Sequence, residues 1–214
     1  MNYIEYDNLD ATFHFEIENK VINDKSINLP VLMIWRADNC VMIGKNQVIE
    51  AEVNLAFAND NGINIVCRPS GGGAIYCDLG TLLYTMIVPF TKDAKSHMEE
   101  TATKIIRALN TMGVDAYREG RNDILLDGKK ISGMAQYTIG KRICTHGSLL
   151  FDTNMDTLTE VLIPHDEKLI PKGIRSIRSR VTNIKPYINE DISVAEFKDR
   201  LRKILTSAYG EHHA

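Results

Sequence analysis

The stretch CRPSGGGAIYCDLG, residues 67–80, places three consecutive glycines between two hydrophobic runs that are typical of β-strands. Glycine loses the most backbone freedom on folding, so such a run predicts a strained turn or a close approach of a ligand to the backbone. Neither a Walker P-loop nor a GxGxxG motif is present, because no Gly-Lys-Ser/Thr follows and the next segment resembles a strand. Consecutive amides can converge on an anion, to which Arg68 and Ser70 would add charge and a hydroxyl donor. A flexible surface turn is the alternative reading of these residues.

Outward from the glycines, the hydrophobic periodicity predicts an α+β fold with mixed, largely antiparallel sheets flanked by helices. An Asp-Gly pair at 127–128 is a strong hairpin signal, and an Asp-Asn pair at 38–39 is a weaker one. Ser193 and Glu196 have the spacing of a helix capping box. The expected strands are 29–37, 40–44, 63–68, 81–88, 123–127, 129–140 and 147–151, and the expected helices are 11–22, 94–113 and 193–205.

The bulk composition excludes several classes of protein. The 214 residues have 44% hydrophobic content, enough for one substantial core, and a net charge of −3 that argues against nucleic-acid binding. The N-terminal residues resemble no secretory signal, and the apolar stretch 82–90 is too short to span a membrane. The four cysteines form no CxxC pair, which favours reduced thiols in a cytoplasmic protein over a disulfide framework or a zinc site.

A second polar cluster, GRNDILLDGKKISGMAQ at 120–136, suggests lysine and carboxylate chemistry. Asp123 begins an apolar run and could bind Mg²⁺, which prefers one or two carboxylates together with phosphate oxygens. Lys129 and Lys130 are adjacent, so on a strand they face opposite sides and one of them can point inward. An inward lysine beside a phosphate-binding loop would neutralise charge that develops when a carboxylate attacks ATP. An isolated DGKK is more often a polar hairpin turn with two exposed lysines.

These motifs, with HGSLLFD and KGIRSIRSRVTNIKP further on, resemble lipoate-protein ligases in order and spacing, from about residue 5 to residue 205. The resemblance places the chain in the wider group of biotin and lipoate ligases and octanoyltransferases. It implies a two-step reaction in which lipoate and ATP, with Mg²⁺, give lipoyl-AMP, which then acylates a lysine. The implied acceptors are lipoyl domains of 2-oxoacid dehydrogenase complexes or the glycine-cleavage H protein.

The resemblance also assigns roles to residues. It implies that Lys130 is the catalytic lysine, touching both the lipoyl carbonyl and the phosphate, and that Arg68 contacts the nucleotide phosphate. Asp123, with Asn122, would hold the metal and nucleotide end. The implied binding residues for ATP and lipoyl-AMP are Arg68, Ser70, Gly71, Gly72, Gly73, Ala74, Ile75, Tyr76, Asn122, Asp123, Lys130, Ser132, His146 and Gly147.

The chain departs from the family pattern in three places and in length. Cys67, Cys77 and Thr81 stand where arginine, histidine and asparagine are frequent. We expect 1–214 to form a single catalytic domain without the family's C-terminal accessory domain, which could be a separate chain. The basic run between residues 168 and 185 is either a solvated loop or a face that steers acidic acceptors; its members are Lys168, Lys172, Arg175, Arg178, Arg180 and Lys185.

Two other functions remain open at the level of sequence. An ATP-independent lipoyl or octanoyl transferase would use a cysteine nucleophile, and Cys144, two residues before His146, has the nearest potential base. A non-catalytic module that binds lipoate is the other possibility. Interaction with nucleic acid or a membrane is not expected.

Overall fold

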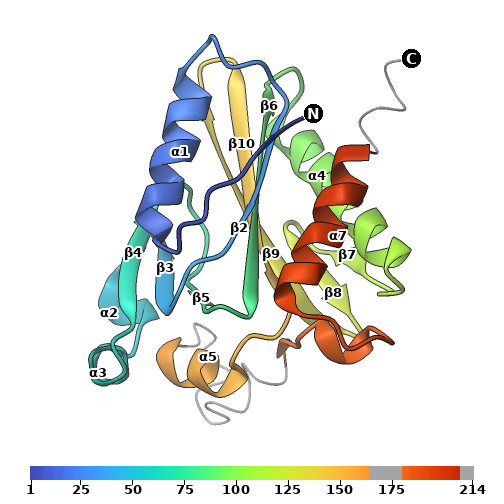
Figure 1. Cartoon of the computed structure of the whole chain (residues 1–214). Helices are drawn as coiled ribbons and strands as arrows, with labels where there is room; N and C mark the ends of the chain where they lie inside the picture. The colour runs from blue at the N-terminus through green and yellow to red at the C-terminus, as the bar shows by residue number, and fades with distance from the viewer. Residues whose placement is uncertain (164–179, 208–214) are drawn as a thin grey trace.

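The computed structural model describes residues 1–163 and 180–207, which form two β-sheets with helices packed against them (Figure 1). The large sheet has the strand order β1 (Asn2–Ile4), β2 (Val31–Trp35), β6 (Thr81–Pro89), β10 (Arg142–Leu150), β9 (Lys129–Ile139), β8 (Asp123–Leu126) and β7 (Tyr117–Glu119). The small sheet has the order β4 (Asn64–Arg68), β3 (Cys40–Gly44) and β5 (Ile75–Cys77). Only the β1–β2 and β3–β4 pairs are parallel among these strands, so the sheets are mixed and largely antiparallel, as predicted.

The two faces of the large sheet have different coverings. Along β2, Leu32 and Ile34 contribute to a core with α4 (Ala94–Thr111) and α7 (Val194–Ser207). Met33 and Trp35 alternate with them and pack on the opposite face, against α1 (Ala11–Asn23) and the small sheet. Every residue of β2 is buried because both faces are covered. The site described below lies on the face that meets α1 and the small sheet.

The remaining elements cover the outer face of the small sheet and complete the chain. The buried residues Val41, Ile43 and Tyr76 pack there in a third apolar cluster with the short helices. These helices are α2 (Ile49–Glu52), α3 (Leu55–Asp60) and α5 (Met155–Val161), and a 3₁₀ turn, η2 (Lys185–Tyr187), precedes α7. No helix among residues 1–163 and 180–207 combines the length and the apolar character that crossing a bilayer requires.

Two of the sequence-based expectations about turns have opposite outcomes. The Asp-Gly hairpin is confirmed, because Asp127 and Gly128 have φ of 50° and 70° and join the antiparallel strands β8 and β9. The hairpin expected at Asn39 is wrong, because β2 belongs to the large sheet and β3 to the small one. Both strands are buried at every position, and each has its own hydrogen-bonded neighbours, β1 and β6 for β2 and β4 and β5 for β3.

Candidate functional site

A pocket of about 100 Å³ lies between the large sheet, the small sheet and α1. Its walls combine apolar side chains with a few polar groups, the composition expected of a small-molecule site. Residues Lys130 and Asn122 contribute from the β8–β9 end, and His146 contributes from β10. The full lining is Phe15, Trp35, Met42, Arg68, Gly72, Gly73, Ala74, Ile75, Leu83, Asn122, Lys130, Gly133, Met134, Ala135, His146 and Gly147.

The glycine loop, which is the segment 69–74 between β4 and β5, borders this pocket. The glycines in and beside it have different reasons to lack side chains. Gly72 has φ of +95°, a conformation that disfavours other residues. Gly44, at the end of β3, touches the loop so closely that a Cβ there would collide with the Gly72 carbonyl oxygen. A Cβ on Gly71 or Gly73 would meet nothing within 4 Å. The chain's own packing therefore does not require these two glycines, and their bare backbone leaves room for a ligand.

Arg68 shapes the loop from the inside. Its guanidinium donates to the carbonyl oxygens of Met42 at 2.8 Å, Gly71 at 2.9 Å and Gly73 at 2.6 Å. The carbonyl groups of Gly71 and Gly73 point toward this buried cation. The amide N–H groups of Gly71 to Gly73 remain available to a ligand, because no described residue accepts a hydrogen bond from them. Burial lowers the pKa of Arg68, and arginine side chains stay charged in proteins. The structure thus gives Arg68 a role in positioning the loop, and contact with a phosphate stays a prediction.

A β-bulge places Lys130 on the pocket side of the large sheet. Ser132 pairs with Ile124 and Lys130 with Leu125, so Ile131 is the extra residue in β9. Strict alternation would have put Lys130 on the same face as Ser132. The bulge puts it instead beside Asp123, with Nζ 2.8 Å from Oδ1. A Cβ on Gly133 would lie 3.0 Å from both Cε and Nζ of Lys130, so the glycine leaves the space that the lysine occupies.

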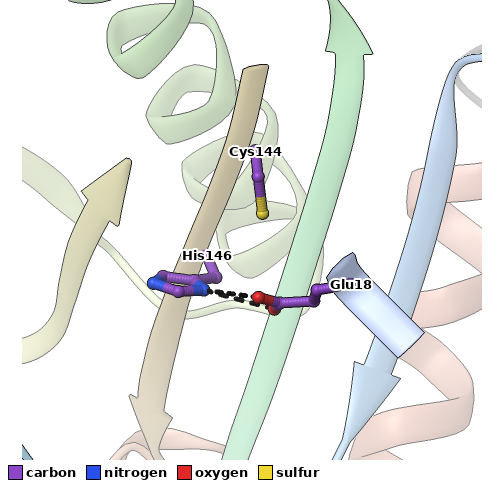
Figure 2. Close-up of side chains that lie close together, drawn as sticks. All are labelled: Glu18, Cys144 and His146. Carbon is purple, nitrogen blue, oxygen red and sulfur yellow. Dashed lines mark hydrogen bonds and ion pairs between the residues drawn. The ribbon is translucent and has the colours of Figure 1, made fainter. Parts of the chain in front are cut away.

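A chain of hydrogen bonds crosses from the small sheet to the large one and on to α1. Ser70 Oγ lies 2.6 Å from Nε2 of His146, and Nδ1 of His146 lies 3.1 Å from a carboxylate oxygen of Glu18. Thr85 donates to Glu18 at 2.5 Å and accepts from the Trp35 indole at 3.1 Å. All five side chains are buried. Figure 2 shows Glu18 directed from α1 toward His146 on β10.

Cys144 lies beside this chain and is fully buried. Burial, with the Glu18 carboxylate nearby, raises the pKa of the Cys144 thiol well above its usual value. A buried thiol next to an anion is a poor nucleophile, because attack requires the thiolate.

The structure brings most of the predicted binding residues to the pocket or its edge, but two lie elsewhere. Ser70 and Gly71 belong to the loop that borders the pocket without lining it, and Asp123 contacts the lining residue Lys130. Tyr76 packs on the outer face of the small sheet, with its hydroxyl on Asn39. Ser132 faces the α4 and α7 core, with its hydroxyl 3.4 Å from that of Tyr84. The predicted binding residues that do line the pocket are Arg68, Gly72, Gly73, Ala74, Ile75, Asn122, Lys130, His146 and Gly147.

Sequence reasoning missed Glu18 and most of the apolar lining. A signal for Glu18 was present, since it falls in line with Ala11, His14 and Val21 on the buried face of α1. A carboxylate on the apolar face of a helix requires a buried partner, which here is His146. Of the predicted basic run, only Arg180 and Lys185 lie within the described residues, and Lys185 pairs with Asp152 at 2.8 Å.

The chain is similar to known proteins of one family. Residues 10–206 match the family described as the lipoyl protein ligase A/B catalytic domain. The lipoate-protein ligase LplJ of Bacillus subtilis is 38% identical over 199 residues, covering 86% of this chain and 60% of the Bacillus protein. A bi-partite lipoate protein ligase from Thermoplasma acidophilum, solved in a study that includes its E2 lipoyl domain, superposes with a TM-score of 0.84 at 29% identity, covering 98% of this chain and 82% of that one. Lipoate-protein ligase A bound with ATP superposes with a TM-score of 0.75 at 28% identity, over 92% and 76% of the two chains.

The chain therefore belongs to the lipoyl protein ligase A/B catalytic domain family. The predicted family and fold class are confirmed. The chain spans 52 to 60% of the length of three curated relatives that it matches.

Proposed function

We propose that this chain activates lipoate with ATP to form lipoyl-AMP and transfers the lipoyl group to a lysine of an acceptor protein. The observation that carries the proposal is the placement of Lys130. Its ammonium, paired with Asp123, lies at the pocket that the open glycine loop also borders. A cation, unsubstituted loop backbone and an apolar slot are the three features that joining an acyl carboxylate to a nucleotide requires.

The proposed reaction needs no covalent bond to the protein. The lipoate carboxylate attacks the α-phosphorus of ATP, an O–P bond forms, and pyrophosphate leaves. Lys130 stabilises the negative charge that grows on the phosphoryl oxygens, and the amides near Gly71 and Gly73 bind the phosphate. The acyl chain lies between Phe15, Trp35 and Leu83, which exclude water. The acceptor amine then attacks the carbonyl carbon, and AMP leaves.

Mg²⁺ fits the end of the pocket near Asp123. The Asp123 side chain is 35% exposed, so a metal ion can reach it, and the preceding residue, Asn122, lines the pocket. Mg²⁺ commonly takes one or two carboxylates with phosphate oxygens. There it would neutralise phosphate charge, while Lys130 and the loop orient the acyl and phosphoryl groups.

Pyrophosphate release tests the proposal, with the neighbouring lysine as the matched control. We expect the wild-type chain to release pyrophosphate when it is given lipoate, ATP and Mg²⁺. Lys130→Ala should lower the rate by about 100-fold or more, because a preorganised charge contributes roughly this much to a transition state. Lys129→Ala should keep the rate within about twofold, since Lys129 does not line the pocket. An equal loss of rate in both variants would contradict a specific role of Lys130 in the reaction.

The transferase alternative predicts a different result from Cys144. Its burial and raised pKa disfavour a thiolate nucleophile, so Cys144→Ala should keep ATP-dependent pyrophosphate release. Acyl transfer from a thioester donor without ATP, lost in Cys144→Ala, would support the transferase. Tight lipoate binding without pyrophosphate release would support the binding module.

The acceptor and the domain arrangement are part of the same proposal. The Thermoplasma relative is described as bi-partite and was studied with an E2 lipoyl domain, which supports lipoyl domains as acceptors and an accessory chain as a helper. We infer that residues 1–214 act as one catalytic unit and that the glycine-cleavage H protein is a second acceptor. Mass spectrometry of each acceptor after incubation tests this, because lipoylation adds the acyl mass to one lysine. An acceptor that stays unmodified by lipoyl-AMP is excluded.

A further inference from the structure

We propose that Asn183 is a positioning residue for the ligase reaction and that it acts through the backbone of Lys130. The inference rests on the proposed function, in which the Lys130 ammonium stabilises charge on the phosphoryl oxygens. Asn183 does not line the pocket. Its side chain instead holds residues 181–184, here called the anchoring segment, in place beside β9.

The β9 strand loses one of its two neighbours before it reaches Lys130. Its ladder with β10 ends at Met134, which pairs with Gly147. On the other side β9 stays paired with β8, but the ladder there contains the bulge at Ile131. A bulge disrupts the ladder locally and bends the strand. The backbone at Lys130 therefore needs a further neighbour on the β10 side to have a fixed position.

The anchoring segment supplies that neighbour. Val181 forms a parallel bridge with Lys130, and the amide of Thr182 donates to the Lys130 carbonyl oxygen at 3.1 Å. Lys130 is thus held between Leu125 of β8 and Val181. The carbonyl group and the side chain of Lys130 share one Cα, so fixing the carbonyl group restricts where the ammonium lies beside Asp123.

Asn183 attaches the anchoring segment to the large sheet. Its amide oxygen accepts from the backbone amide of Thr153 at 3.0 Å, and its amide nitrogen donates to the Thr153 carbonyl oxygen at 2.9 Å. Thr153 is buried just beyond β10, and its hydroxyl lies 2.8 Å from that of Thr81 on β6. A carboxamide offers a donor and an acceptor side by side, whereas a carboxylate lacks the donor and an alkyl side chain lacks both.

Loss of the Asn183 side chain should loosen the anchoring segment where it meets Lys130. The next hydrogen bond along the chain joins the amide of Ile184 to the Leu150 carbonyl oxygen at 2.7 Å, so the rest of the segment stays attached. Local opening of this kind leaves the global fold intact. It displaces the Lys130 backbone slightly, and a misplacement of about 1 Å can lower a rate by roughly 100-fold.

Amide hydrogen exchange at Thr182, followed by NMR, tests the attachment without reference to activity. The amide should be protected in the wild-type chain. Asn183→Ala should accelerate its exchange by about 10-fold or more, since each of the two lost hydrogen bonds contributes roughly fivefold to the opening equilibrium. Asn110→Ala is the matched control, because Asn110 also bonds a backbone amide, that of Ala116, but near the end of α4. It should leave Thr182 exchange unchanged.

Pyrophosphate release tests whether the attachment serves Lys130. Asn183→Ala should lower kcat by about 10-fold or more, with the KM for ATP nearly unchanged, because a misplaced ammonium weakens the transition state rather than substrate binding. In a chain that already carries Lys130→Ala, adding Asn183→Ala should cause no further loss, because the group that Asn183 positions is gone. Asn110→Ala should keep the rate within about twofold, as expected of a substitution away from the site.

The outcomes separate this inference from the proposed function. The same fractional loss with and without Lys130 would show that Asn183 acts independently of the lysine and would overturn the inference. Faster exchange of Thr182 with an unchanged rate would overturn it too. A wild-type Thr182 amide that exchanges as fast as an unstructured peptide would overturn it without any variant. A wild-type chain that releases no pyrophosphate contradicts the proposed function, whereas protection of Thr182 that depends on Asn183 still supports the attachment.

Discussion

At the scale of the residue, the lack of a side chain at Gly133 leaves the space in which the Lys130 side chain lies. A Cβ there would lie 3.0 Å from the end of the Lys130 side chain and 4.0 Å from Oδ1 of Asp123. Gly133→Ala should therefore push the ammonium away from Asp123 with little effect on folding, because only a flexible side-chain end must move. A misplacement of about 1 Å costs roughly 100-fold in rate, so we expect pyrophosphate release to fall by about this factor.

The melting temperature of Gly133→Ala separates this effect from unfolding. It should stay within a few degrees of wild type while the rate falls. If the rate is unchanged, the position of Lys130 beside Asp123 has no importance for the reaction. If rate and melting temperature fall together, the glycine serves the fold instead.

Residues differ in how far the sequence reveals them. Lys130 and the glycine loop are recognisable because their neighbours in sequence form motifs. Glu18 is not, because its partner His146 lies 128 residues away and only the packing of α1 on β10 joins them. The bulge at Ile131, which alternation alone does not predict, likewise places Lys130 and Ser132 on opposite faces of the large sheet.

At the scale of the element, α7 begins with a complete capping box. The Ser193 hydroxyl accepts from the Glu196 amide at 3.2 Å, and the Glu196 carboxylate accepts from the Ser193 amide at 2.7 Å. Ser193→Ala should lower the free energy of unfolding by about 1 kcal/mol, measured by urea denaturation, because the cap stabilises the first turn. Ser193→Thr should keep most of the stability. An equal loss of stability in both variants would show that the Ser193 hydroxyl does not stabilise the helix.

Elements with a local cause were predictable, and those with a tertiary cause were not. The helix at 94–113 and the hairpin at 127–128 follow from periodicity and turn chemistry, and both are present. The separation of β2 and β3 into two sheets depends on which strands lie beside each, β1 and β6 beside β2 and β4 and β5 beside β3. The short helices α2, α3 and α5 carry too few turns to show a helical period.

At the scale of the whole molecule, His14 links stability to pH. Its Nε2–H donates to the Asn8 carbonyl at 2.7 Å, its Nδ1 is buried without a hydrogen-bond partner among the described residues, and its ring stacks on Trp35 at 4.4 Å. Burial lowers the pKa of His14, so the folded state binds its proton less readily than the unfolded state does. Stability should then decrease as the pH falls below about 6.5, the usual value for unfolded histidine, until the folded-state pKa is passed.

His14→Phe checks this dependence, because phenylalanine keeps a ring against Trp35 and removes the titration. Urea denaturation between about pH 7 and pH 5 should show a smaller loss of stability in the variant than in wild type. The difference in slope reaches at most about 1.4 kcal/mol per pH unit, the value for one proton. Parallel curves would assign the pH dependence to other groups.

The hydrogen bond between Ser70 and His146 joins two sheets that share no strand. The glycine loop connects β4 and β5 of the small sheet, whereas Lys130 lies on β9 of the large one. The pocket therefore exists only while the two sheets keep their alignment, although each sheet has its own ladder of backbone hydrogen bonds. On heating, we expect the catalytic rate to decline at a lower temperature than the secondary-structure content does. A small displacement of one sheet relative to the other separates the two halves of the site while both sheets remain folded.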